Sequence, residues 1–241
     1  MLVTIFGGGG FLGRNVAQEL LAQGMRVRVA ERDPAHALRV KPLGNLGQTQ
    51  LVHADVRDAA SVERAVAGSD AVVNLVAVLK RDLDGVNHKG AANVAQAVAS
   101  AGVKTLVHIS AIGSDPESKS AYGRSKGQGE QAVRDAFPKA TLIRPSIMFG
   151  REDQFTNRFA NLIRMAPVLP VIAGATKFQP VYVVDVARAI AAAVADTEAH
   201  AGKTFELGGP QVMSMAEINS WIAAQIGHDP MMLALPNCAS E

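Results

Sequence analysis

Short apolar runs alternate with amphipathic helical patterns through the first 145 residues of the chain. Each run is rich in Val, Ile or Leu and ends at a polar or glycine-containing break, as buried strands do. Helical patterns begin near Phe11, Ser61, Asn87 and Ser120. Strands separated by helices predict an α/β protein with a doubly wound parallel sheet. The predicted strands are Leu2–Phe6, Arg26–Ala30, Gln50–His53, Ala71–Val76, Thr105–Ser110 and Ala140–Ile143.

The pattern becomes irregular after Pro145, where loops, single helices and short strands follow one another. Ser214 and Glu217 have the spacing of a capping box, which predicts the start of a last helix through Trp221. We therefore expect a first domain at residues 1–148 and a small mixed cap at residues 149–241, interleaved with the end of the sheet. The other elements expected there are a loop at Gly150–Gln154, a helix through Phe159, a strand near Gln179–Tyr182, a helix from Asp185 and a strand at Lys203–Leu207.

The composition supports this class. Hydrophobic residues make up 48% of the chain and aromatic residues only 5%, which suits parallel strands packed by Ala-rich helices better than a β-sandwich. The net charge is +2, from 24 basic and 22 acidic residues spread along the chain, so we expect no nucleic-acid partner. The six histidines show no ligand spacing, and we expect no metal site.

Cysteine usage and apolar patterning predict a cytoplasmic protein. The lone Cys238 cannot form an internal disulfide, and the N-terminus opens with a strand and glycines rather than a secretory signal. The apolar stretch Ala166–Ala175 is interrupted by Pro167 and Pro170 and is too short to span a bilayer. It leaves open a surface contact with a membrane or a partner. The tail from Leu235 reads as a loop, which fits a natural chain that continues further.

A glycine-rich turn lies where the first predicted strand meets the first helix. Gly7, Gly10 and Gly13 form a GxxGxxG pattern, with Phe11 and Leu12 before the last glycine. Gly7 permits a sharp turn, Gly10 lets the backbone approach a pyrophosphate, and Gly13 lets the helix pack close to the sheet. The helix N-terminus presents N–H groups to the anion. This context predicts a Rossmann-type site for NAD(H) or NADP(H).

The end of the second predicted strand bears on which dinucleotide is bound. Glu31 stands where a Rossmann domain holds the 2′-hydroxyl of the adenosine ribose, which favours NAD. Arg32, helped by Arg14 on the first helix, is suited to a 2′-phosphate, which favours NADP. The sequence leaves the choice between the two cofactors open.

Further candidate contacts follow the third and fourth strands, at the edge of the sheet where ligands of open α/β sheets lie. Asp55 and Val56 come after the third strand, where a carboxylate and a backbone N–H can meet the edge of the adenine. Asn74 ends the fourth strand and is followed by Leu75 and Val76. We expect these three residues beside the middle of the dinucleotide.

Tyr122 and Lys126 lie four residues apart at the start of a predicted helix, so they share one face of it. A lysine ammonium nearby lowers the pKa of a phenol toward neutrality. A tyrosine so activated can act as general acid or base in hydride transfer between carbonyl and alcohol. The YxxxK spacing by itself is common by chance. Its position directly after the fifth strand makes it stronger evidence for such a site.

Together these motifs resemble the short-chain dehydrogenase/reductase superfamily, in its extended or atypical, epimerase/dehydratase-like branch. The match covers nearly the whole chain. More narrowly, the chain is similar to the nucleotide-binding accessory subunits of respiratory complex I and their bacterial relatives, and the phrase Met-Phe-Gly-Arg-Glu-Asp at 148–153 is specific to them. The segments that carry the narrower resemblance are Ser120–Lys126, Arg144–Phe155, Gln179–Ala187 and Leu207–Pro210.

The resemblance implies a tightly held dinucleotide, with a structural or assembly role at the peripheral arm of complex I in the mitochondrial members. It implies that Lys126 binds the hydroxyls of the nicotinamide ribose, whether or not Tyr122 transfers protons, and that Pro145 lies at the cofactor. The location that follows is cytoplasmic and peripheral to the inner membrane. The oligomeric state is not indicated.

Active members of the superfamily also need a Ser or Thr just past the fifth strand to polarise the substrate carbonyl. The register of the resemblance places Ala111 or Ile112 there, with Ser110 or Ser114 as the substitute hydroxyls. Loss of such a donor costs an oxyanion roughly 3 kcal/mol of stabilisation. This departure favours binding over catalysis.

Two hypotheses follow. In the first, the chain is a cofactor-binding accessory protein whose cap contacts a partner such as complex I at the membrane surface. In the second, it is an NAD(P)-dependent oxidoreductase, epimerase or dehydratase, which acts on a nucleotide sugar, lipid or quinone-related carbonyl with Tyr122 as acid or base, Lys126 beside it and Ser110 as the hydroxyl donor.

Overall fold

The computed structural model describes residues 1–165 and 167–235 and divides into two compact units. The first unit consists of Met1–Pro145 and Val184–Leu207, and the second of Ser146–Val183 and the residues from Gly208 onward. Residues 184–207 thus return to the first unit, and a division into functional domains at residue 148 stays a prediction. Ala166, Cys238 and the rest of the tail after Leu235 lie outside the described residues.

A parallel sheet in the order β11-β6-β5-β4-β1-β2-β3 forms the centre of the first unit. Every pairing in it is parallel, which confirms the predicted doubly wound sheet. The order reverses between β1 and β4, and ligands of open α/β sheets bind beside the strand ends at such a point. The strands are β1 (Leu2–Phe6), β2 (Arg26–Glu31), β3 (Thr49–His53), β4 (Ala71–Asn74), β5 (Thr105–Ile109), β6 (Thr141–Pro145) and β11 (Thr204–Leu207).

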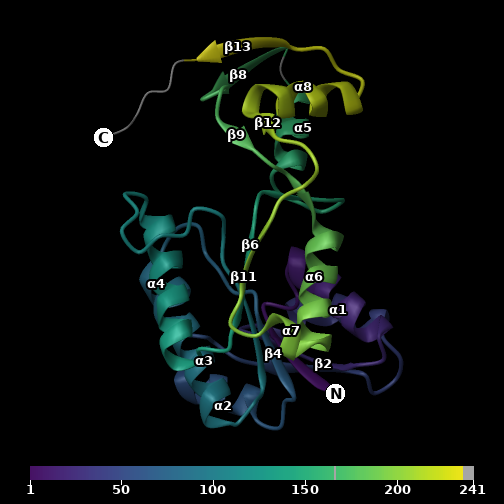
Figure 1. The fold of residues 1–241 in the computed structure, drawn as a ribbon. Coiled ribbons are helices and arrows are strands. Elements are labelled where there is room, and N and C mark those ends of the chain that lie inside the picture. Colours follow the sequence, from purple (N-terminus) through teal and green to yellow (C-terminus); the bar gives the residue numbers. More distant parts are fainter. Residues whose placement is uncertain (166, 236–241) are drawn as a thin grey trace. The chain divides into compact units, whose positions relative to one another are not determined.

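Helices cover both faces of this sheet: α2, α3 and α4 lie on one side and α1 and α6 on the other (Figure 1). Buried valines and alanines of α2 and α3 pack on the sheet in one apolar cluster. The helices of the unit are α1 (Phe11–Ala22), α2 (Ala59–Val66), α3 (Gly90–Ser100), α4 (Ala121–Ala136), α6 (Val183–Ala195) and α7 (Thr197–His200), with a 3-10 helix η1 (Pro34–Leu43) and a π-helix η2 (Asp84–Lys89).

The sequence did not predict η1. Asp33 caps it by accepting the N–H of Ala35, and Ala37 and Val40 are its buried residues. Because so few of its side chains are buried and Pro42 lies inside it, the segment carries no helical period of apolar positions.

The described residues of the second unit form three two-stranded ribbons and two helices. β8 pairs with β13 in parallel, and Figure 1 shows them side by side. Ser214 and Glu217 form the predicted capping box at the start of α8. The predicted loop at Leu235 was wrong, since this residue ends β13. The elements are β7 (Met148–Phe149), α5 (Thr156–Met165), β8 (Val168–Ile172), β9 (Lys177–Phe178), β10 (Val181–Tyr182), β12 (Met213–Ser214), α8 (Met215–Gln225) and β13 (Met231–Leu235).

In the part of the chain that the structure describes, no helix is both long and apolar enough to cross a membrane.

A buried ion pair fastens α4 to the sheet. Arg144 on β6 donates to both carboxylate oxygens of Glu130 on α4, at 2.9 and 2.6 Å, and also lies 3.4 Å from Glu206 on β11. Glu130 is only 7% exposed, so its charge depends on this partner. Tyr122 and Lys126 lie on the same helix. The Glu130–Arg144 ion pair therefore fixes how far these two residues lie from the sheet.

We expect Arg144→Met to lower the free energy of unfolding by about 2 to 3 kcal/mol, because it leaves Glu130 buried and unpaired. Urea denaturation of both proteins measures this. The double variant Glu130→Gln/Arg144→Met should recover part of the loss. Arg64→Met, at an exposed position on α2, serves as control and should change stability by less than about 0.5 kcal/mol. Equal losses in Arg144→Met and the control would contradict this account.

Candidate functional site

The glycine turn between β1 and α1 has the geometry of a phosphate cradle. Gly7 has a φ of +81°, which strongly favours glycine. A Cβ on Gly13 would collide with the carbonyl oxygen of Gly7, so glycine there lets the helix start directly against the turn. Gly10 is the N-cap of α1, and no described side chain caps it. The N–H groups of the first helical turn, at Phe11 and Leu12, are thus left for an anion.

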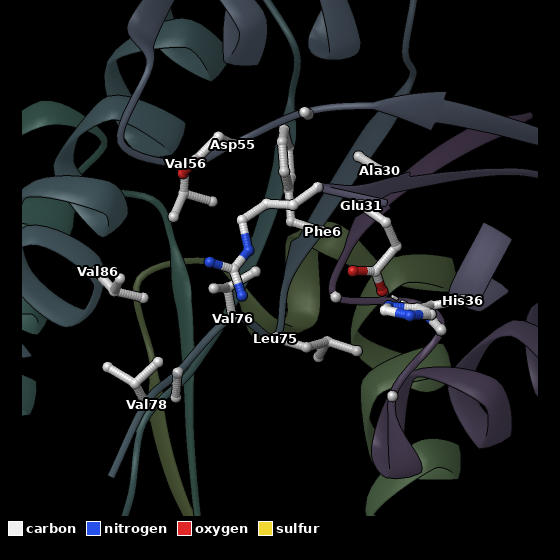
Figure 2. A pocket seen from close by; sticks show the side chains of 16 residues that line it. Phe6, Ala30, Glu31, His36, Asp55, Val56, Leu75, Val76, Val78 and Val86 are labelled. Atoms are coloured by element: carbon white, nitrogen blue, oxygen red, sulfur yellow. Dashed lines mark hydrogen bonds between the residues drawn. The ribbon is translucent and has the colours of Figure 1, made fainter. Parts of the chain in front are cut away.

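A cavity of about 360 Å³ continues from this turn along the ends of β1, β2, β3 and β4. Figure 2 shows Phe6, Leu75 and Val76 around it, with Glu31 on one side and Asp55 on the other. Its size and its place at the carboxyl edge of the sheet suit the adenosine half of a dinucleotide. Most predicted cofactor contacts therefore converge on one cavity. Those that line it are Gly7, Gly10, Glu31, Arg32, Asp55, Val56, Leu75 and Val76.

Glu31 is held in place at the end of β2. One of its carboxylate oxygens accepts the backbone N–H of Gly9 at 2.7 Å, which ties the strand end to the glycine turn. Arg32 is exposed and also lines the cavity. A fixed carboxylate suits a ribose hydroxyl and the guanidinium suits a 2′-phosphate. The geometry leaves NAD(H) and NADP(H) both open.

Asp55 carries its own counter-ion. Arg57 donates to both oxygens of Asp55 and reaches Asp82 at 3.1 Å. Hydrogen bonding by Arg57 lowers the pKa of Asp55 to about 2, so this carboxylate stays ionised and can only accept hydrogen bonds. Val56 beside it is buried. This fits an edge that accepts an exocyclic amine of a base.

Asn74 is not part of the cavity lining. It is only 2% exposed, its amide nitrogen lies 3.2 Å from Nδ1 of His108, and its oxygen accepts the N–H of Val76. It therefore shapes the turn at Leu75 and Val76 from behind. A direct contact with the dinucleotide stays a prediction.

Lys126 is a residue of α4 whose side chain is almost wholly buried, and it donates to the carbonyl oxygen of Ile109 at 2.7 Å. Burial lowers its pKa from 10.5 to about 8. Burial also raises the pKa of Tyr122 above its ordinary value. The prediction that Lys126 lowers the pKa of the phenol was wrong, because desolvation dominates at Tyr122 and the ammonium is directed at the backbone of β5.

The hydroxyls expected beside a substrate carbonyl, those of Ser110 and Ser114, make hydrogen bonds within the protein. Ser114 donates its proton to the carbonyl oxygen of Ala111 at 2.8 Å, and the hydroxyl oxygens of Ser110 and Ser114 lie 2.9 Å apart. The two hydroxyls therefore bond each other and the backbone, and either oxygen can be the donor within the pair. Both side chains are buried, and Ile112 beside them is 46% exposed. Both hydroxyls thus have hydrogen-bond partners inside the protein.

Sequence reasoning missed Asn87, which joins three segments around the site. Its amide accepts the N–H of Val78 and donates to the carbonyl oxygen of the same residue, both at 2.9 Å, and it also donates to Ser125 on α4. Asn87 lies at the start of a predicted helix, but nothing local in the sequence names its partners. It holds the cavity wall at Val78 against the helix of Tyr122.

His108 was also missed. It is 1% exposed, and its Nε2 finds no hydrogen-bond partner within residues 1–165 and 167–235. Burial, and after it the nearby charge of Lys126, hold the pKa of His108 well below its ordinary value, so the ring is neutral.

Residues 1–165 and 167–235 contain no group of three or more His, Cys, Asp or Glu side chains that could hold a metal ion.

Comparison with known proteins gives a consistent result. The sequence model of the NAD dependent epimerase/dehydratase family matches residues 3–208. A mitochondrial NADH dehydrogenase [ubiquinone] 1 alpha subcomplex subunit 9 from Arabidopsis thaliana is 37% identical over 98% of this chain and 60% of its own length. A ceramide reductase from Caulobacter vibrioides is 32% identical over 79% of this chain and 60% of its own length. This chain thus spans about 60% of the length of these relatives.

The fold is also that of solved structures. A dTDP-glucose 4,6-dehydratase from Streptomyces venezuelae, solved with NAD bound, superposes with a TM-score of 0.81. The two sequences are 22% identical, and the match covers 98% of this chain and 85% of that one. At this identity the likeness concerns the fold.

The lowered pKa of Lys126 predicts a pH-dependent stability. Between about pH 8 and pH 10.5 the unfolded chain binds more protons at this lysine than the folded chain does, so stability rises with pH in this window. Relative to Lys126→Met, the free energy of unfolding of the dinucleotide-free wild type should rise by roughly 2 kcal/mol from about pH 7 to about pH 9.5.

Chemical denaturation at several pH values measures this difference, and other titrating groups cancel between the two proteins. Lys104→Met, at an exposed lysine of the same unit, is the matched control and should run parallel to wild type. Parallel curves for Lys126→Met as well would show that Lys126 titrates normally.

Proposed function

The chain belongs to the NAD dependent epimerase/dehydratase family, and we propose that it is an NAD(P)(H)-binding member with an accessory or structural role related to complex I. In this role the bound dinucleotide stabilises the fold instead of turning over.

The residues present fit the dinucleotide. The uncapped N-terminus of α1 at Gly10 would hold the pyrophosphate, and Glu31 or Arg32 the adenosine ribose. Asp55 and Val56 would meet the adenine. Tyr122, Lys126 and Pro145 would lie at the nicotinamide ribose, as the resemblance implies. A bound dinucleotide would supply hydride-transfer chemistry. The protein would then either use this chemistry in catalysis or prevent it.

One observation carries the choice of an accessory role: the hydroxyls of Ser110 and Ser114 are buried and hydrogen-bonded to each other and to the backbone. A developing oxyanion needs a hydrogen-bond donor aimed at it, and a missing donor typically costs a factor of about 100 to 1,000 in rate. The exposed residue beside the pair is Ile112, which cannot donate from its side chain. A raised pKa at Tyr122 further opposes proton transfer from a neutral solution.

The second unit offers a surface for a partner. On β8 and β13, one face packs inward through Leu169 and Val171, while the other exposes apolar side chains in register. The exposed pairs are Val168 with Met231, Pro170 with Leu233, and Ile172 with Leu235. Exposed apolar faces of this kind mark contact surfaces. The mitochondrial relatives are complex I subunits, and we assign this face to complex I, next to the inner membrane.

A second candidate function is a reductase, epimerase or dehydratase that uses Tyr122 as acid or base on a nucleotide sugar, lipid or quinone-related carbonyl. Two observations favour it. Tyr122 and Lys126 are both present on α4, and a ceramide reductase is among the relatives.

For the accessory role we expect purified protein to release NAD(H) or NADP(H) on denaturation, and mass spectrometry identifies which. Incubated with a panel of carbonyls and alcohols, the bound dinucleotide should keep its oxidation state, with wild type and Tyr122→Phe indistinguishable. Turnover that disappears in Tyr122→Phe would instead establish the enzyme. Protein that releases no dinucleotide and binds none on titration would remove both functions.

The partner is tested in membranes of the source organism. Tagged chain should co-migrate with complex I on native gels, and Leu233→Asp should abolish this because it places a charge in the apolar face. Leu46→Asp, at a fully exposed leucine of the first unit, is the matched control. Co-migration that survives Leu233→Asp would exclude this face as the contact.

A further inference from the structure

The second unit contains an apolar cavity of about 160 Å³ that shares no lining residue with the cavity at the glycine turn. Phe149, Phe155 and Trp221 bring aromatic rings to it, and Met213 and Ile218 add aliphatic side chains. All of these residues belong to the second unit, so the cavity is complete within it.

The aromatic wall is a built feature. The rings of Phe149 and Trp221 meet edge to face, with centroids 6.5 Å apart, and Tyr182 lies 5.6 Å from Phe149 on another side. Aromatic residues make up only 5% of the chain, and Trp221 is its single tryptophan. Trp221 lines the cavity and is also 45% exposed, so part of its side chain faces solvent.

Polar groups are scarce in the wall. Thr156 and Gln211 are the polar residues among the described ones that line it. Thr156 donates its hydroxyl proton to Asp153, which leaves Gln211 to bond a ligand. The arginines and lysines of the unit are absent from this lining. A nucleoside diphosphate needs cations or several N–H donors for its charge, and this wall provides neither.

We infer that this cavity binds the end of a linear alkyl chain, with Gln211 facing a neutral polar group. An apolar cavity of roughly 150 Å³ holds a molecule the size of benzene, so about six carbons of a chain fit here. The inference goes beyond the proposed function and does not depend on it, because the cavity shares no residue with the dinucleotide site.

Trp221 reports directly on occupancy, since no other tryptophan contributes to the fluorescence. In the full-length protein, 1-decanol should cause a saturable change in tryptophan emission and raise the thermal midpoint, and UDP-glucose should do neither. Ile147→Phe, which fills the cavity, should weaken 1-decanol at least tenfold. Val212→Phe, at an exposed neighbour outside the lining, should bind as wild type does.

A second matched pair keeps the test decisive if Ile147→Phe unfolds. Gln211→Asp places a charge in the lining at an exposed position and should also weaken 1-decanol at least tenfold, while Val212→Asp should not. A 1-decanol response that does not saturate, or that survives Gln211→Asp unchanged, overturns the inference. So does a saturable response to UDP-glucose in place of 1-decanol. Dinucleotide release is measured in parallel and is expected to be the same in all variants.

Discussion

The close approach of α1 to the turn after β1 is the constraint on which the binding site depends. It exists because Gly13 has no Cβ where the carbonyl oxygen of Gly7 lies. The approach brings the uncapped helix N-terminus to the carboxyl edge of the sheet, beside the ends of the neighbouring strands. The bond from Gly9 to Glu31 then couples the turn to β2. These two contacts hold together the turn that would bind the pyrophosphate and the carboxylate that would meet the ribose.

A second constraint acts beneath α4, where several polar groups are buried between helix and sheet. Each has a hydrogen-bond partner inside the protein: Lys126 has Ile109, Ser110 has Ser114, and Glu130 has Arg144. Such groups cost free energy to bury and are tolerated when they are paired. These bonds hold α4 against the sheet.

The second unit has a different character, because its apolar side chains are not all used in its own core. One set lies on the outer face of β8 and β13, and another surrounds the cavity at Trp221. A small unit that keeps apolar surface in two places is built to contact other molecules. A partner on one and an aliphatic chain in the other would give this unit its role, while the first unit supplies a folded, dinucleotide-stabilised base.

The sequence by itself determined the class of the fold, the glycine turn, and the order along the chain of the strands and helices of the first unit other than η1 and α7. These features follow from local rules: the period of apolar positions, the conformation of Gly7 and the capping residues. The sequence also predicted that most residues of the cavity lining lie close together, because parallel strands all end at one edge of the sheet. Only the tertiary structure decided which hydrogen bonds those residues make. The pairs Asn74 with His108, Asn87 with Val78, and Glu130 with Arg144 join residues from separate elements. Spacing along the chain therefore could not reveal them, nor the burial that raises the pKa of Tyr122.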